Sequence, residues 1–333
     1  MNILQRLSKR FGMYGWRSIF WFPYYVILKS GMIYNSVRYK HKPKESVKVG
    51  NNIMHLNPKD KGISVDLILN PNREELSQIM LTSIKNDDCI LDVGGNIGYY
   101  ALKEAEIVKG HGKLFVIEPV SENVKWLTKN MLVNGYKDTM IFQKAMGDVR
   151  GEVAINLSEH SNMHTFTIRT DDRQIGQETV ELDTIDHFCS EQKIIPNFIR
   201  MDVEGYEYEI IKGAEKILSK NNVIKLMIEF HPQLMGYEKA RNFLSILSKH
   251  GFESEYVVYD NLFYPFFALG SLPYHALLFL EGMFLQRSNR LLGKVHKNIR
   301  IQDMLKDNDL LNGKIGWPHI LFVKRKTSSS LRH

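Results

Sequence analysis

Residues 90–100, ILDVGGNIGYY, decide the fold of this chain. A short apolar run ends at Asp92, a glycine-rich turn follows, and a helical pattern begins at Tyr99. This order predicts a strand, a tight turn and a helix, in which the backbone of the turn can approach a ligand closely. The residues that we expect to contact this ligand are Asp92, Gly94, Gly95, Asn96, Gly98 and Tyr99.

A second apolar run, at residues 113–117, supports the same interpretation. It is followed by Glu118, 26 residues after Asp92. An acidic residue at the end of the second strand of a βαβ unit binds ribose hydroxyls in nucleotide sites. A cofactor-free α/β protein with the same turn is the alternative, but it has no need of an acid at this position. The two signals together predict a nucleoside cofactor.

The details of the turn indicate which nucleoside cofactor fits it. A dinucleotide fingerprint needs G-x-G-x-x-G, and here Val93 stands where the first glycine would be. A P-loop ends in Gly-Lys-Ser or Gly-Lys-Thr, and this turn has no such ending. What remains is D-x-G-x-N-x-G, whose carboxylate and amide side chains suit a ligand that carries an amino acid group. We therefore predict S-adenosylmethionine as the cofactor.

Alternating strand and helix patterns extend from this unit in both directions. They predict a mostly parallel sheet with helices on both faces. We also expect a strand at 63–69 and a helix at 73–84 before the glycine turn, and extra β structure at 152–156 and 179–182. The seven strands of the main sheet are predicted at 90–93, 113–117, 140–145, 198–202, 225–230, 254–259 and 319–324.

Residues that directly follow these strands are the further candidates for the site. In open α/β sheets the ligand lies beyond the carboxyl ends of the strands, where the strand order reverses. We therefore add Ala145 and Met146 to the cofactor site, and we expect Asp202 and Glu204 to place two carboxylates at its mouth. In the alternative interpretation, Asp202 caps the next helix and Glu204 binds backbone amides.

Several of these segments resemble one known family. The segments DVGGNIGYY, VIEP, TVELDTID, IRMDVEGYEYEIIKGAEKIL and LMIEFHP are similar to those of FkbM-family S-adenosylmethionine-dependent methyltransferases. The similarity runs from residue 88 to residue 232, less than half of the chain. The resemblance implies a Rossmann-like class I methyltransferase fold. It also implies O-methylation of a hydroxyl group on a saccharide, a glycolipid or a related metabolite.

Methyl transfer to a hydroxyl needs aligned reactants and a group that removes a proton. The candidate bases are His231, Asp202 and Glu204, and His164 in a polar loop is a further one. A histidine suits a base near neutral pH, although His231 in a purely structural turn is the alternative. Asp202 and Glu229 could also bind a divalent metal, but no spacing in the sequence demands one. We therefore predict no metal.

The N-terminal region carries the excess charge of the chain. The net charge is +7, and the first 45 residues hold nine basic residues and one acid. Seven large aromatic side chains lie between residues 14 and 25, and the apolar run at 19–28 is too short to span a bilayer. This composition predicts a helical arm on an anionic membrane surface, and packing against the catalytic domain is the alternative. Because the cofactor is made in the cytosol, we expect a cytoplasmic protein, peripheral on the inner face of the membrane.

A second apolar segment lies at residues 262–285. Proline, glycine, histidine and glutamate interrupt it, so a membrane-spanning helix is not expected. We expect a helical insertion that caps the pocket, forms a homo-oligomer interface or touches a membrane; a buried helical pair is the alternative. A basic helix is expected to follow, with Arg287, Arg290, Lys294 and Lys297 on one face.

The expected domains are an arm and linker at 1–57, a methyltransferase core at 58–260, a helical insertion at 261–318, and a last strand with a disordered tail at 319–333. The expected partner of the core is a saccharide or a lipid-linked saccharide. A basic arm also suits an RNA methyltransferase. However, the fourth strand ends in DVEG, whereas base-methylating enzymes have an Asn/Asp-Pro-Pro-aromatic turn there, so nucleic acid is not expected. A non-catalytic membrane-associated protein with the same fold is the remaining alternative.

Overall fold

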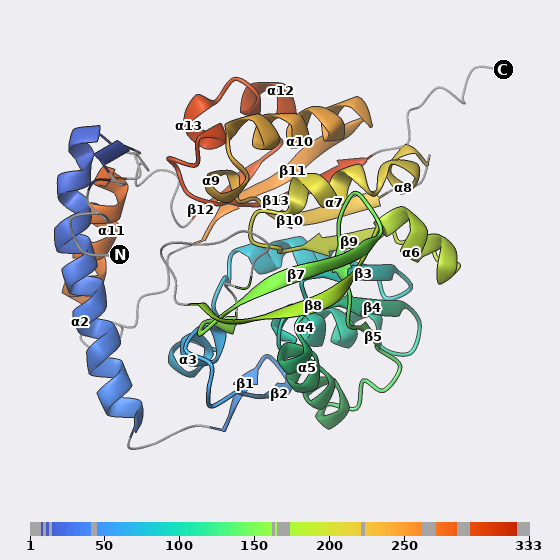
Figure 1. Ribbon diagram of the computed structural model, residues 1–333, viewed down its shortest axis with the longest axis horizontal. Helices are drawn as coiled ribbons and strands as arrows, with labels where there is room; N and C mark the ends of the chain where they lie inside the picture. Colours follow the sequence, from blue (N-terminus) through green and yellow to red (C-terminus); the bar gives the residue numbers. More distant parts are fainter. Residues whose placement is uncertain are drawn as a thin grey trace.

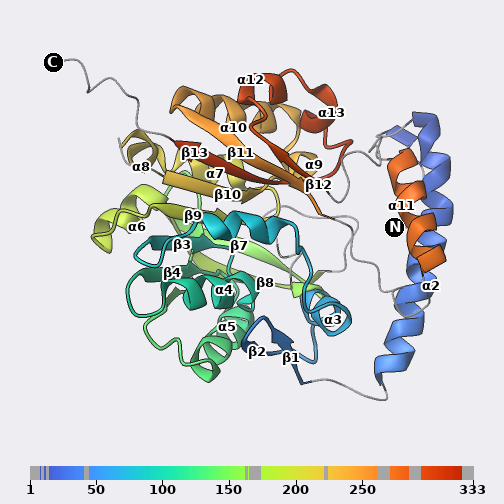
Figure 2. The ribbon, with the colours of Figure 1, turned by 180° about the vertical axis from the view of Figure 1, so that it is seen from behind.

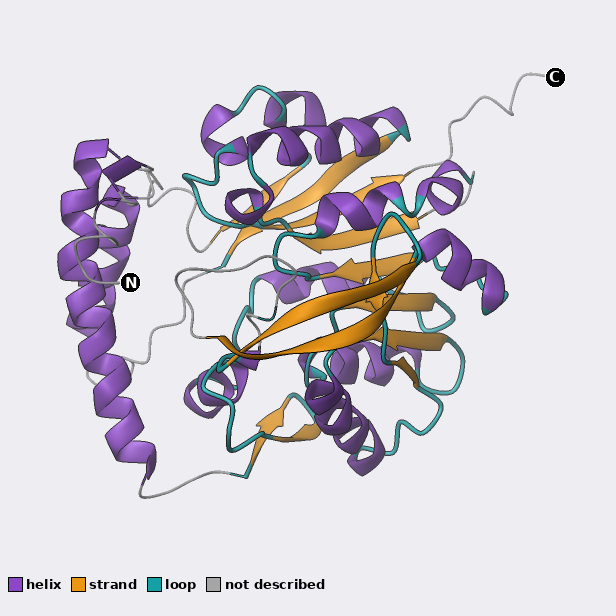
Figure 3. Cartoon of the chain, viewed as in Figure 1, coloured by secondary structure: helices purple, strands orange, loops and turns teal. Residues whose placement is uncertain are grey.

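The structure is a computed structural model that describes residues 8, 11–12, 15–40, 45–161, 164, 174–220, 224–260, 271–284 and 294–324. An α/β body has a pair of helices at one side (Figures 1 and 2). The centre of the body is an eight-stranded sheet between layers of helices (Figure 3). A smaller three-stranded sheet and a two-stranded sheet lie beside it.

The main sheet is mostly parallel. Its strands are β3 (Cys89–Val93), β4 (Lys113–Ile117), β5 (Met140–Phe142), β9 (Phe198–Met201), β10 (Ile224–Glu229), β11 (Phe252–Tyr259), β12 (Lys294–Lys297) and β13 (His319–Lys324). Their order is β12-β11-β13-β10-β9-β3-β4-β5. The five strands from β10 to β5 are parallel, whereas β13 is antiparallel to both of its neighbours. The order reverses at β3, which has β4 on one side and β9 on the other.

All seven strands predicted for the main sheet are present, but an eighth replaces part of a predicted helix. Residues 294–297 form β12, which pairs with residues 256–259 of β11, so the prediction of a basic helix there is wrong. The spacing of Lys294 and Lys297 suits a helix, but the edge of β11 offers backbone hydrogen-bond partners that a charge pattern does not reveal. The other part of that predicted helix, with Arg287 and Arg290, lies outside the described residues.

Side chains of the parallel strands alternate between two hydrophobic clusters, one on each face of the sheet. In β3, for example, Ile90 belongs to one cluster and Leu91 to the other. The cluster with Ile90 is covered by α4 (Tyr99–Val108) and α5 (Ser121–Val133). The opposite cluster is covered by α6 (Ile185–Glu191), α7 (Glu207–Lys212), α8 (Glu215–Ser219), α9 (Pro232–Met235), α10 (Tyr237–Lys249), α12 (Ile301–Met304) and α13 (Asn308–Leu311).

The segment before the glycine turn differs from the prediction. Residues Ile63–Leu69 form helix α3, so the predicted strand is wrong. The Asp60 carboxylate accepts hydrogen bonds from the backbone N–H groups of Gly62 and Ser64, at 2.8 and 2.7 Å, and so stabilises the start of the helix. The helix predicted at 73–84 is a 3-10 helix, η2 (Ser77–Ser83). A hairpin of β1 (Ser46–Val49) and β2 (Asn52–His55) precedes α3, and its apolar side chains join the core.

The predicted extra β structure is confirmed. Strands β6 (Ala145–Met146), β7 (Gly151–Ser158) and β8 (Gln174–Asp183) form the three-stranded sheet. The β7–β8 hairpin crosses in front of the main sheet in the view of Figure 1. Most of the polar loop that joins β7 to β8 lies outside the described residues.

The helical pair consists of η1 (Gly15–Phe20) and α2 (Trp21–Lys40), which pack against α11 (Ser271–Phe284). Figure 2 shows α2 and α11 side by side, at the edge of the molecule. Trp21, Leu277 and Glu281 are buried, whereas several apolar side chains of η1 and α2 are exposed. Among the described residues, every helix is too short or too polar to cross a bilayer.

Candidate cofactor and active site

The carboxyl ends of β3, β4, β9 and β10 lie at one edge of the sheet because these strands are parallel. The loops after β3 and β9 diverge there, which is the place where open α/β sheets bind ligands. A cavity with about 610 Å³ of empty space, partly open to solvent, occupies this position. The predicted site residues that line it are Gly94, Asn96, Glu118, Ala145, Met146, Asp202 and Glu204.

The glycine turn is shaped by close packing as much as by access to the cavity. Gly94 and Gly98 have φ angles of +87° and +99°, which L side chains rarely adopt. A Cβ atom on Gly94 would collide with the carbonyl oxygen of Asp202, and one on Gly95 would collide with Val116. Gly94 and Gly95 each donate a backbone hydrogen bond to the carbonyl oxygen of Ile117, at 2.9 and 3.1 Å. The glycines therefore let the ends of β3, β4 and β9 approach one another.

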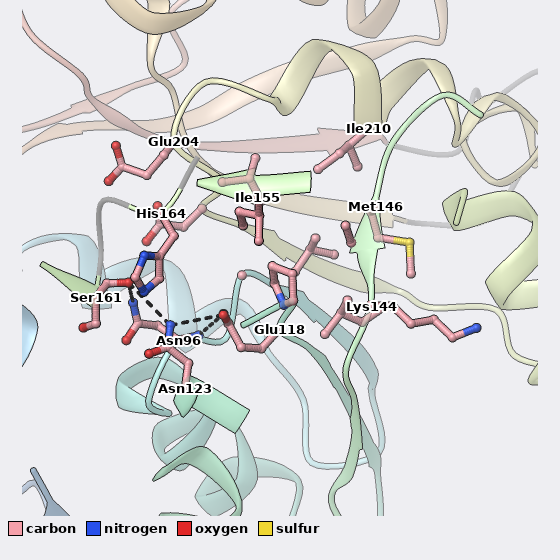
Figure 4. A pocket seen from close by; sticks show the side chains of 17 residues that line it. Asn96, Glu118, Asn123, Lys144, Met146, Ile155, Ser161, His164, Glu204 and Ile210 are labelled. Carbon is pink, nitrogen blue, oxygen red and sulfur yellow. Dashed lines mark hydrogen bonds between the residues drawn. The ribbon is translucent and has the colours of Figure 1, made fainter. Parts of the chain in front are cut away.

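Glu118 lies in the wall of the cavity and is only 4% exposed. Its Oε2 accepts a hydrogen bond from the backbone N–H of Asn96 at 2.8 Å. Its Oε1 accepts hydrogen bonds from the backbone N–H of Val120 and from Nδ2 of Asn123, both at 3.1 Å. Figure 4 shows the side chains of Asn96, Glu118 and Asn123 at the cavity. Burial raises the pKa of Glu118 to about 7, although the three hydrogen bonds oppose that rise.

Ser161 and His164, which follow β7 in the chain, line one side of the cavity. The carbonyl oxygen of Ser161 accepts hydrogen bonds from Nδ2 of Asn96 at 3.0 Å and from Nδ2 of Asn123 at 3.4 Å. The backbone N–H of Ser161 donates to the Asp60 carboxylate at 2.8 Å. His164, a candidate base in the sequence, also lines the cavity. Asn123 and Ser161 were not evident from the sequence, since only the folded loop brings them to Asn96.

Asp92 lies behind the cavity and not in its wall. Its side chain is fully buried, and its Oδ1 pairs with Nη1 of Arg200 at 2.9 Å. The same guanidinium pairs with Oδ2 of Asp202 at 3.0 Å. Asp202 lines the cavity, so Arg200 links it to the buried end of β3. In the sequence, Arg200 lies between two apolar residues of a predicted strand. This pattern does not reveal that its side chain reaches two carboxylates.

Three other residues predicted for the cofactor site also lie outside the cavity wall. Gly95 and Gly98 pack against Val116 and Leu127, respectively. The Tyr99 hydroxyl donates a hydrogen bond to the backbone carbonyl of Arg73 at 2.6 Å, and its ring is buried. The structure therefore gives these residues a role in shaping the turn and the helix after it.

A cluster of charged side chains lies next to Asp202. Ligating atoms of Asp202, Glu229 and His231 all lie within 4.8 Å of one another. Nδ1 of His231 is 2.6 Å from Oε1 of Glu207, and Nε2 of His231 is 3.5 Å from Oε1 of Glu229. His231 and Glu207 are 4% and 0% exposed, so this pair is held inside the protein. Glu207 lies in the first turn of α7 and was not predicted as a site residue.

The pKa shifts in this cluster have opposing causes. Burial by itself would lower the pKa of His231, but the charge and hydrogen bond of Glu207, together with Glu229, raise it well above its ordinary value. Burial and the neighbouring Glu229 carboxylate raise the pKa of Asp202 well above its ordinary value. Groups of this kind beside a cavity mark a candidate for acid–base chemistry.

Comparisons with known proteins place a methyltransferase domain over the central part of the chain. Residues 92–254 match the family model of the methyltransferase FkbM domain. The hexuronic acid methyltransferase AglP of Haloferax volcanii is 25% identical over 160 residues, which is 47% of this chain and 62% of that protein. The match therefore spans less than two thirds of that relative's length.

Two solved structures have a weaker likeness to this chain. A SAM-dependent methyltransferase from Aquifex aeolicus is 17% identical, with 58% of this chain and 88% of that chain covered and a TM-score of 0.35. Fibrillarin from Aeropyrum pernix, with natively bound S-adenosyl-L-methionine, is 13% identical, with 57% and 70% covered and a TM-score of 0.35. The strand order of the sheet and the family model assign the fold.

The mostly parallel sheet, its helices on both faces and the family model together confirm the predicted Rossmann-like class I methyltransferase fold. Residues 92–254 of this chain therefore match the FkbM methyltransferase domain, as the sequence motifs predict, and they support an S-adenosylmethionine-dependent methyltransferase.

Proposed function

We propose that the whole chain is an S-adenosylmethionine-dependent O-methyltransferase that acts on a hydroxyl group of a saccharide, a glycolipid or a related metabolite. The observation that carries this proposal is one cavity that holds both Glu118 and Asp202. Glu118 follows the second strand of the βαβ unit, and Asp202 follows the neighbouring strand on the other side of β3. A nucleoside and an acceptor hydroxyl would thus meet between two carboxylates.

The residues of the cavity fit S-adenosylmethionine. Glu118 supplies a buried carboxylate for ribose hydroxyls, and the Oγ of Ser161 is buried there with no hydrogen-bond partner among the described residues. Ile117, Pro119 and Met146 supply apolar surface for a planar base. We assign the methionine end to the turn from Gly94 to Asn96, whose backbone borders the cavity. When bound, the cofactor supplies a methyl group on a sulfonium that needs no activation by the protein.

The chain has to orient the acceptor hydroxyl and take its proton. Asp202 and Glu204 both line the cavity, so either carboxylate can reach a hydroxyl held there. His231 lies behind them, and its Nδ1 is paired with Glu207. We therefore assign the proton to the Asp202/Glu204 pair and give His231 a positioning role. A positioned base contributes about 10²–10⁴ in rate.

An exposed tryptophan supports a saccharide as the acceptor. Trp317 is 43% exposed, and its ring lies 6.3 Å from the His231 ring, centroid to centroid. A tryptophan combines a large apolar face with a polar edge, and such a surface suits the apolar face of a sugar ring. The similarity to a hexuronic acid methyltransferase supports the same substrate class.

The helical pair supports a lipid-linked or membrane-delivered form of that saccharide. Exposed apolar side chains recur along one side of η1 and α2, at Ile19, Phe22, Val26 and Ile33. Arg17 and Lys29 lie among them, in the region that carries nine basic residues. Apolar side chains beside basic ones suit the headgroup region of an anionic membrane. We propose a peripheral enzyme on the cytoplasmic face of the membrane.

The direct test has two stages. Calorimetry should show binding of S-adenosylmethionine to the purified chain. Incubation with methyl-labelled cofactor and fractionated native glycolipids should then transfer label to a saccharide fraction. Binding without transfer to any fraction would leave a cofactor-binding protein and would contradict the enzymatic proposal. Transfer to RNA would replace the saccharide with a nucleic acid.

A further inference from the structure

We propose that Asp202, Glu229 and His231 bind a divalent cation beside the cofactor cavity. The sequence predicts no metal, because no spacing between these residues demands one. The fold nevertheless brings one oxygen of each carboxylate and a ring nitrogen of His231 within 4.8 Å of one another. Carboxylate oxygens with an imidazole nitrogen form a ligand set that suits Mn²⁺, and Mg²⁺ with added water.

The orientation of His231 is the one that a metal ligand needs. Glu207 engages Nδ1 at 2.6 Å, which leaves Nε2 facing Glu229 at 3.5 Å. Histidine ligands usually give their second ring nitrogen to a carboxylate, which fixes the ring and the tautomer. Glu207 is fully buried, so it holds the ring without competition from water.

His319 gives a second, independent indication. It is only 5% exposed, and its Nε2 has no hydrogen-bond partner among the described residues. This nitrogen lies 3.6 Å from Oε2 of Glu229 and 3.7 Å from Oε2 of Glu74. Both distances are too long for a hydrogen bond. A buried polar atom is thus aimed at the proposed ligand Glu229 without a direct bond.

The charge of the surrounding network also favours a cation. The network holds seven carboxyl groups against two guanidinium groups and two histidines, and carboxylates without a counter-charge are costly where they are buried. The network consists of Asp66, Glu74, Asp92, Asp202, Glu207, Glu229, Asp260, Arg73, Arg200, His231 and His319. A divalent cation offsets two negative charges at the point where Asp202 and Glu229 approach each other.

The role of the cation rests on the proposed function. Asp202 lines the cavity, so a cation on it would lie where the acceptor oxygens bind. Two neighbouring saccharide oxygens could then coordinate the cation, which would orient the hydroxyl that is methylated. Because Asp202 would be a ligand, the proton would go to Glu204, the other carboxylate of the pair.

The test is a titration of the full chain with Mn²⁺ after removal of metals by a chelator, with free Mn²⁺ measured by electron paramagnetic resonance. We expect one Mn²⁺ per chain, and at least ten-fold weaker binding in both Glu229→Gln and Asp202→Asn. The matched control is Glu191→Gln. Glu191 belongs to a second acid–histidine cluster, with Asp183 and His187, where Lys144 already lies 3.6 Å from Asp183.

The outcomes separate this inference from the proposed function. Absence of Mn²⁺ binding to the wild-type chain would overturn the inference, as would unchanged binding in both cluster variants. Loss of binding in Glu191→Gln alone would move the site to the other cluster. Methyl transfer at full rate in excess chelator would also contradict the cation site, but it would support the proposed methyltransferase activity. Mn²⁺ binding in a chain that transfers no methyl group would keep the site and reject the proposed function.

Discussion

Oε1 of Glu207 lies 2.6 Å from Nδ1 of His231, and 24 positions of the sequence separate these two residues. Glu207 comes from the first turn of α7 and His231 from the residue before α9. The pair is buried, so the carboxylate fixes both the ring orientation and the proton position of His231. Nε2 of His231 in turn lies 3.5 Å from Oε1 of Glu229, so the fixed ring also holds a position relative to Glu229.

The variant Glu207→Gln tests this relationship. We expect kcat to fall about 10- to 100-fold, because the residue that orients a functional histidine is lost as a charged partner. The pKa of His231 should fall at the same time, so the pH profile should shift, while affinity for S-adenosylmethionine stays constant. Glu209→Gln on the same helix is the control, since Glu209 pairs with Lys239. Equal kcat values and pH profiles in both variants would assign Glu207 a purely structural role.

The pH dependence of cofactor binding should follow Glu118. Burial raises the pKa of Glu118 to about 7, so this carboxyl gains a proton as the pH falls through neutrality. The ionised form accepts hydrogen bonds from ribose hydroxyls, so calorimetry should show weaker binding of S-adenosylmethionine below about pH 7. In Glu118→Gln the affinity should fall by about 1–3 kcal/mol, and the pH dependence should disappear. If the affinity of Glu118→Gln for S-adenosylmethionine still falls below about pH 7, another titrating group causes the pH dependence.

The stability of the cofactor-free protein should decrease as the pH rises, whereas the affinity for S-adenosylmethionine should increase. The pKa of Glu118 lies above its ordinary value of 4.5, so the folded chain holds this proton more tightly than the unfolded chain does. The contribution of Glu118 to the free energy of unfolding therefore decreases as the pH rises from about 4.5 to about 7. Urea unfolding of wild type and Glu118→Gln at pH 5 and pH 8 measures this difference. We expect the wild type to lose stability relative to Glu118→Gln between pH 5 and pH 8. A gain in stability over this range would contradict the burial of the Glu118 carboxyl.

The variant Gly94→Ala should be more destabilising than its φ angle alone requires. A Cβ atom at this position would collide with the carbonyl oxygen of Asp202. Gly110 is a matched control, because its φ of +83° is similar and no atom lies within 4 Å of its Cβ position. Urea unfolding should show a loss of about 1–2 kcal/mol in Gly110→Ala. It should show a loss of about 4 kcal/mol or more in Gly94→Ala. Equal losses would show that the loop moves away from Asp202 at little cost.

The variant Trp317→Ala should raise KM for the saccharide acceptor. Loss of an aromatic platform costs about 0.5–1.5 kcal/mol, which corresponds to roughly a 2- to 12-fold higher KM. Trp317→Phe should recover most of the affinity because it keeps an aromatic face. Steady-state kinetics with varied acceptor and saturating cofactor separates KM from kcat. An unchanged KM in Trp317→Ala would place the sugar elsewhere.

Membrane binding should depend on the exposed side of η1 and α2. The full chain should sediment with liposomes that contain anionic lipid, and salt should weaken this binding because it screens the basic residues. The double variant Ile19→Ser/Phe22→Ser should bind less, since it removes two exposed apolar side chains. Val149→Ser/Ile195→Ser, at exposed positions on the body, is the control. If the wild-type chain stays in the supernatant at low salt, α2 and α11 form only a packing unit.

The sequence by itself determined the architecture. Strands of four to six apolar residues between helical patterns require a parallel sheet covered on both faces, because every such strand has two faces to bury. The turn after Asp92 and the acid at Glu118 then predict a cavity at the carboxyl edge of the sheet, since parallel strands end at one edge, and the structure has a cavity there. These inferences succeeded because they depend on the local order of residues and on the periodicity of apolar side chains.

The tertiary structure decided which side chains meet. It paired Arg200 with both Asp92 and Asp202, and it brought Glu207 to His231. It also made residues 294–297 a strand on the edge of β11. Contacts of this kind depend on the distance between elements and on unpaired backbone groups. Neither quantity is encoded in a local pattern, so the pairing of Arg200 and Glu207 with the predicted site residues became visible only in the folded chain.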